Sequence, residues 1–82
     1  MSLQASLSVA LDIGEDDATR ADALSTVLDA VASGAPVPSY SRSDRYALLL
    51  LSARVSRRLS DRTSRYLSTL RADDYAPRGS RS

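Results

Sequence analysis

The first segment of the chain alternates between apolar and polar residues. Apolar side chains occupy the odd positions from 3 to 13, and the even positions between them are polar apart from Ala10. A period of two is typical of a β-strand, whereas the Ala, Leu and Gln content also suits a helix. The alternation favours the strand, and the helix is the alternative. Because no second strand is predicted further along, such a strand would have to pair with another chain.

The next apolar pattern has the period of a helix. Apolar residues recur at positions 21, 24, 27, 28 and 31, which lie on one face of an amphipathic helix. Asp16 or Asp17 can accept hydrogen bonds from the first turn, and Gly34 suits the left-handed conformation that often follows a helix. The pattern therefore predicts a helix over 17–33.

A second helix follows a connector over 34–42, in which Pro36 and Pro38 exclude helical structure. Ser41 or Ser43 can cap this helix, and nothing in the sequence stops it, so we expect one continuous helix over 43–71. The expected fold is mainly α: a short N-terminal strand or helix, then two helices, the second long and amphipathic. These elements form a single small domain over 1–72, and residues 73–82 are expected to be a disordered tail.

The long helix carries a repeat. From 51 to 70 the sequence reads in units of four residues, and Ser takes the second place in all five units. Residues at the same place in successive units are offset by about 40° around the helix. The residues therefore fall into an apolar, a basic and a hydroxyl band. The serine band either lets another helix approach closely or faces solvent. The basic band contains the residues that we predict to bind a partner: Arg54, Arg57, Arg58, Arg62 and Arg65.

This basic band has few acidic neighbours on its own helix, since only Asp61 is placed to pair with Arg57 and Arg65. Three kinds of acceptor remain open: Asp22 and Asp29 of the preceding helix, nucleic-acid phosphates, or an acidic protein. The planar guanidinium group suits bidentate pairing with carboxylates and phosphates alike.

The chain has few residues with which to build a core. Only 18 of its 82 residues are Leu, Val or Ile, and it contains no Phe or Trp. A domain of this size is marginally stable, and the absence of Cys excludes disulfides. We therefore expect oligomerisation to complete the core. The expected oligomer interface consists of Leu7, Val9, Leu11, Leu48, Leu51, Val55, Leu59 and Tyr66.

The residue inventory argues against an enzyme. There is no His and no Cys, and all 11 basic residues are Arg, so Ser-His-Asp, Cys-His and Ser-Lys arrangements are excluded. The three Gly are isolated, so there is no phosphate-binding loop. We expect no cofactor, no metal site and no small-molecule substrate. The absence of a long apolar run and of a basic signal-peptide start predicts a cytoplasmic protein without a membrane span.

Charge divides the chain into two halves. Residues 1–40 hold one Arg and six acidic residues, for a net charge of −5, and residues 41–82 hold ten Arg and four Asp, for +6. The chain also lacks Lys, Asn and Phe, which fits a GC-rich coding sequence of a bacterium or its phage.

Two functional hypotheses follow. The first is a small non-enzymatic interaction or assembly protein, such as a bacterial or phage accessory protein, that acts through its basic C-terminal helix. Its partner would be another copy of the chain or a larger protein. The alternative is a dimeric β-ribbon DNA-binding transcriptional regulator with the order strand, helix, helix. The absence of basic residues from the expected strand argues against this alternative.

Overall fold

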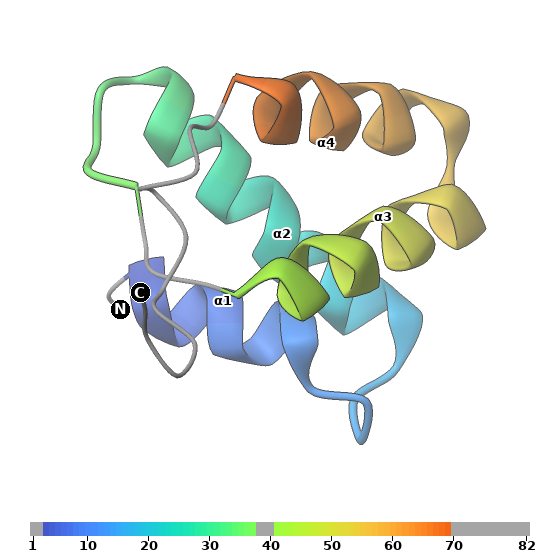
Figure 1. Cartoon of the computed structure of the whole chain (residues 1–82). Coiled ribbons are helices and arrows are strands. Elements are labelled where there is room, and N and C mark those ends of the chain that lie inside the picture. The colour runs from blue at the N-terminus through green and yellow to red at the C-terminus, as the bar shows by residue number, and fades with distance from the viewer. Residues whose placement is uncertain (1–2, 38–40, 70–82) are drawn as a thin grey trace, which may run out of the picture.

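The computed structural model describes residues 3–37 and 41–69, and this part of the chain is mainly α-helical, as expected. It contains the helices α1 (Leu3–Leu11), α2 (Asp17–Ala32), α3 (Arg42–Val55) and α4 (Arg57–Ser68), and none of these residues forms a strand. Helices α1 and α2 form one hairpin, and α3 and α4 form a second one (Figure 1). Helices α2 and α3 each contact all three other helices, and α2 is the longest helix and contributes the most buried residues.

The strand favoured for residues 3–13 is wrong, and the helical alternative is what the structure shows. Helix α1 buries Ser6, Leu7 and Ala10, which recur at helical spacing against α2. A helix satisfies its backbone hydrogen bonds within the segment, which a strand without a partner cannot do. Leucines at every fourth position fit the period of a strand and that of a helix, so the alternation alone does not distinguish a strand from a helix. Ile13, which the strand would have included, lies beyond α1 and is 89% exposed.

The ends of α2 follow the sequence signals closely. At the start, the backbone N–H of Thr19 donates to Asp16 Oδ1 at 2.7 Å, so Asp16 is the N-cap. At the end, Gly34 adopts a φ of 101°. The N–H of Gly34 donates to the carbonyl of Val31, and that of Ala35 donates to the carbonyl of Ala30, both at 3.0 Å. This pair of bonds is the Schellman motif, in which a glycine satisfies the last carbonyls of a helix.

One buried charge joins the first two helices. Arg20 of α2 is buried, and its Nε donates to the carbonyl oxygen of Ala10 at 2.9 Å. This carbonyl is in the last turn of α1, where the helix itself offers no donor. The Arg20 side chain therefore supplies the missing hydrogen bond and fastens the end of α1 to α2. Sequence reasoning counted Arg20 only as a charge.

The continuous helix expected over 43–71 is also wrong, because the chain bends at Ser56. This residue is extended, with φ −166° and ψ 154°, and it ends α3 and begins α4. Its N–H donates to the carbonyl of Ser52, and its Oγ accepts from the N–H of Leu59, both at 3.1 Å. In a straight helix Leu67 would lie about 24 Å along the axis from Leu51. The bend instead brings both leucines into one core.

That core is built by a single copy of the chain. All four helices contribute to it, and its buried apolar residues are Leu7, Ala10, Ala21, Leu24, Val27, Leu28, Leu48, Leu51, Leu59 and Leu67. Ser41 begins α3 through a capping box with Asp44, and this helix contributes Leu48 and Leu51 to the core.

Half of the oligomer interface expected from the sequence belongs to the core of one chain. Four of its residues are already buried within one chain: Leu7, Leu48, Leu51 and Leu59. Val9, Leu11 and Tyr66 are half-buried, and Val55 is 39% exposed. Burial of the four leucines does not require a second copy.

The remaining expectations from the sequence concern the membrane and the tail. Within the described ranges, no helix has the length and apolar character needed to cross a bilayer. The tail expected over 73–82 lies outside the described residues.

Candidate functional site

Helix α4 separates its apolar and charged residues more sharply than any other helix of the described chain. Leu59, Thr63 and Leu67 are buried on one side. At about 100° per residue, Arg57, Arg58 and Arg65 fall on the opposite side of the helix, and all three are exposed. We call these three side chains the arginine face.

Two other arginines of the expected basic band are paired with acidic residues of α2. Arg54, in the last turn of α3, donates from Nη2 to Asp17 Oδ1 at 2.9 Å. This hydrogen bond lowers the pKa of Asp17 below its ordinary value and raises the pKa of Arg54. Both side chains are about half exposed, so solvent weakens the interaction.

The second pair joins α2 and α4, where Arg62 Nη2 donates to Asp29 Oδ1 at 2.5 Å. Asp29 was one of the two intrachain acceptors that the sequence suggested, and it takes this role. The other, Asp22, forms no ion pair within the described residues. Asp17, which the sequence indicated only as part of the helix start, forms the ion pair with Arg54.

The arginine face keeps its charges unpaired. Within residues 3–37 and 41–69, Arg57, Arg58 and Arg65 form no ion pair or hydrogen bond through their side chains. Asp61 lies one helical turn from both Arg57 and Arg65, yet it pairs with neither. The structure thus divides the five expected arginines into two that are paired and three that are free to meet an acceptor.

The serine band predicted along the long helix does not form one surface. Ser52 is fully buried and donates to the carbonyl of Leu49 at 3.0 Å. Ser56 forms the joint between α3 and α4, Ser60 is half-buried, and Ser64 is exposed. The bend at Ser56 separates the serines of the repeat. Ser52 is packed in the core, whereas Ser64 and Ser68 face solvent.

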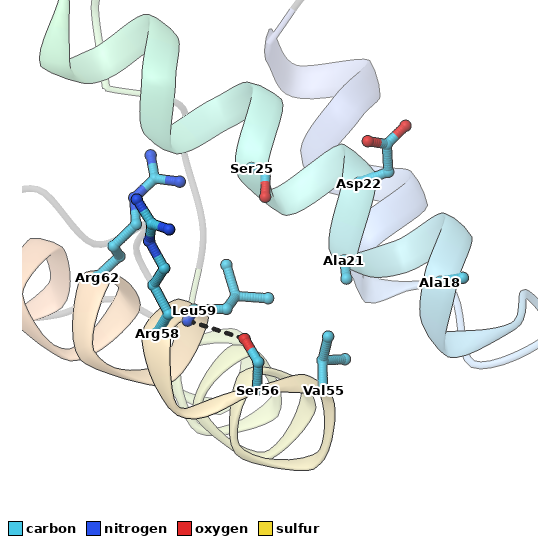
Figure 2. A pocket seen from close by; sticks show the side chains of 9 residues that line it. All are labelled: Ala18, Ala21, Asp22, Ser25, Val55, Ser56, Arg58, Leu59 and Arg62. Carbon is cyan, nitrogen blue, oxygen red and sulfur yellow. Dashed lines mark hydrogen bonds between the residues drawn. The ribbon is translucent and has the colours of Figure 1, made fainter.

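A groove opens between α2 and the joint of α3 and α4 (Figure 2). Its volume is about 400 Å³. The residues that line it are Ala18, Ala21, Asp22, Ser25, Val55, Ser56, Arg58, Leu59 and Arg62. The sequence contained no signal for this groove, because it exists only where the chain bends at Ser56 and folds α4 back toward α2.

The chemistry that this region offers is hydrogen-bond donation from guanidinium and hydroxyl groups, which suits the binding of anions. In the described part of the chain, no cluster of three or more Asp, Glu, His or Cys residues is arranged to hold a metal ion. Comparisons with protein-family models, with curated proteins and with solved structures find no match.

Proposed function

We propose that this chain is a small non-enzymatic interaction module whose arginine face binds an acidic segment of a protein partner. The observation that carries the proposal is the difference between the paired and unpaired arginines. Arg54 and Arg62 have acidic partners, whereas Arg57, Arg58 and Arg65 share one exposed side of α4 with none in the described residues. Like charges on one helix side repel each other, so an external acceptor would stabilise this arrangement.

The acidic residues around the arginine face favour a protein over a nucleic acid. Asp61 lies within the face, Asp22 lines the adjacent groove, and Asp29 is beside Arg62. A row of phosphates that follows this surface would also approach these carboxylates, and like charges repel. A protein surface can place a basic side chain opposite Asp61 while it offers carboxylates to the arginines. The mixed charges therefore support a partner that also carries mixed charges.

A β-ribbon regulator would need a strand within residues 3–13 that pairs across a dimer. Helix α1 occupies Leu3–Leu11 instead, and its buried side contacts α2.

The proposal is tested by fluorescence anisotropy with a labelled helical peptide rich in Glu and containing two Lys. At low salt we expect saturable binding that weakens as salt screens the charges. Arg57→Gln combined with Arg65→Gln should weaken binding at least tenfold. The matched control, Arg42→Gln combined with Arg45→Gln, removes the same charge from α3 and should change the affinity by less than threefold.

A parallel titration with generic duplex DNA separates the two partner classes. If duplex DNA binds more tightly than the peptide at equal ionic strength, the protein-partner proposal is overturned in favour of nucleic acid. If neither probe binds at low salt, the arginine face has no interaction function. Sedimentation equilibrium of the chain alone then shows whether the acidic segment comes from a second copy, since self-association would disappear in the Arg57→Gln, Arg65→Gln variant.

A further inference from the structure

The groove beside α4 combines an apolar floor with hydrogen-bond donors that lack acceptors. Ala21 and Leu59 are buried beneath it, and Val55 is partly exposed toward it. Ala18 extends the apolar surface along α2. Small side chains on α2 keep this floor open instead of filling it, which leaves room for an apolar group of a few carbon atoms.

Two hydroxyl groups line this groove, one on α2 and one at the joint between α3 and α4. Ser25 of α2 is half-buried, and its Oγ has no hydrogen-bond partner in the described part of the chain. Ser56 uses its oxygen to accept from the N–H of Leu59, so its own proton remains available to donate. Both hydroxyl groups are therefore free to donate to an acceptor bound in the groove.

Two guanidinium groups complete the donor set. Figure 2 shows the side chains of Arg58 and Arg62 extending from α4 toward α2, on the side where Ser25 faces the groove. Arg58 has no acidic partner among the described residues, whereas Arg62 shares one of its nitrogens with Asp29. A guanidinium group carries five N–H donors, so Arg62 retains donors for a second acceptor.

Asp22 borders the groove one turn before Ser25 on α2 and forms no ion pair within the described residues. Figure 2 shows its carboxylate pointing away from the groove and from the two arginines. A ligand with a single negative charge can therefore meet Arg58 and Arg62 without approaching this carboxylate.

From these observations we infer that the groove is a carboxylate-binding subsite, which takes one acidic side chain of the partner segment together with a short apolar neighbour. The carboxylate would accept from Arg58, Arg62 and Ser25, and the apolar neighbour would cover Val55 and Leu59. This inference rests on the proposed function, because it names the chemistry that the acidic partner presents to the chain.

The test uses hexanoate as the probe, because it joins one carboxylate to a short apolar chain. In ¹⁵N-edited nuclear magnetic resonance titrations of the full chain, we expect saturable amide shifts at Ala21, Ser25, Ser56 and Leu59. Hexanol lacks the charge and inorganic phosphate lacks the apolar group, so each should bind at least fivefold more weakly than hexanoate.

Two single variants separate the groove from the rest of the arginine face. Arg58→Gln should weaken hexanoate binding about tenfold, the scale of a lost charge-assisted hydrogen bond. The matched control, Arg65→Gln, removes the same charge from the same helix outside the groove. It should change the affinity for hexanoate less than twofold. Equal effects of the two variants would overturn the subsite, as would shifts spread over α4 without saturation.

The outcome for the subsite is distinguishable from that for the proposed function. If the acidic peptide binds but hexanoate gives no saturable shifts, the arginine face acts without the groove and the subsite is wrong. If hexanoate binds at the groove but the peptide does not bind, the site recognises a small carboxylate and the protein-partner proposal is wrong.

Discussion

The two hairpins of this molecule differ in how the chain reverses direction. Between α1 and α2 the turn has several residues, and Asp12 Oδ1 accepts from the N–H of Gly14 at 2.9 Å before Asp16 caps the next helix. Between α3 and α4 a single residue, Ser56, both ends the first helix and caps the second. The first turn contains Gly and Asp, the residues that turns favour, whereas the second contains only one serine of a serine-rich repeat.

This difference shows that a helix can end without a residue that forces it to end. Asp12 and Asp16 favour the first turn through local hydrogen bonds to the backbone N–H groups of Gly14 and Thr19. Ser56 merely permits a turn, because a serine is acceptable within a helix and favourable at its start. At Ser56 the core decides, since only the bend brings Leu59 and Leu67 to α2. Substitutions can test this contrast, beginning in the core that both hairpins share.

The largest effect is expected at Leu24, which is fully buried in α2. Leu24→Ala should lower the free energy of unfolding by about 2–5 kcal/mol, because it removes buried apolar contacts and leaves a cavity. Urea denaturation followed by circular dichroism measures this change. The matched control is Leu50→Ala on α3, where the side chain is 46% exposed and the loss should be much smaller. Equal losses would contradict the burial of Leu24 in the core.

Ser56→Ala tests the bend directly. The substitution removes the oxygen that accepts from the N–H of Leu59, so we expect a loss of about 1 kcal/mol in the free energy of unfolding. In a continuous helix the same change would raise stability, since Ala is the better helix former. Ser64→Ala, on the exposed side of α4, is the control and should be neutral or slightly stabilising. A stabilising effect at both positions would contradict the break between α3 and α4.

Substitution of Thr63 is expected to raise the free energy of unfolding instead of lowering it. Its side chain is fully buried in α4, and its Oγ1 has no hydrogen-bond partner in the described part of the chain. Thr63→Val keeps the shape and removes the unsatisfied hydroxyl, so we expect a gain of up to about 1 kcal/mol. Thr26→Val on α2 is the control, because that hydroxyl is exposed and already donates to the carbonyl of Asp22. A loss of stability at Thr63 would show that its hydroxyl has an acceptor.

The smallest effect is expected where the two hairpins meet through an ion pair. The pKa of Asp17 lies below its ordinary value of 3.8 because Arg54 donates a hydrogen bond to it. The pair therefore contributes stability above that ordinary pKa, and the contribution is lost as the pH falls through the lowered pKa. Asp17→Asn should lower the melting temperature slightly at neutral pH and have no effect in strong acid. Asp22→Asn, which breaks no ion pair in the described residues, should not reproduce this pH dependence.

Sequence reasoning was accurate where signals were local and failed where they were not. The cap at Asp16 and the left-handed Gly34 both lie where their chemistry predicted them. The N-terminal alternation was misleading because leucines at positions 3, 7 and 11 satisfy a strand and a helix equally. Only the contact with α2, and the need to satisfy the backbone, selected the helix.

The candidate site was predictable in its composition but not in its arrangement. The sequence identified the five arginines and one correct acceptor, Asp29. It could not show that Arg54 reaches Asp17, because that pair spans 37 positions and depends on how α3 packs against α2. The groove could not be predicted for the same reason, since Ser25 and Ser56 line one groove only in the tertiary fold.

The sequence by itself therefore determined the mainly helical class, the bounds of α2, the division of charge and the inventory of donors. These follow from propensity, capping and composition, which act over a few residues. Tertiary structure alone decided the helical state of the first segment, the bend at Ser56 and the separation of paired from unpaired arginines. Each of these depends on burial of apolar surface between segments far apart in the chain, and that free energy exists only once the helices meet.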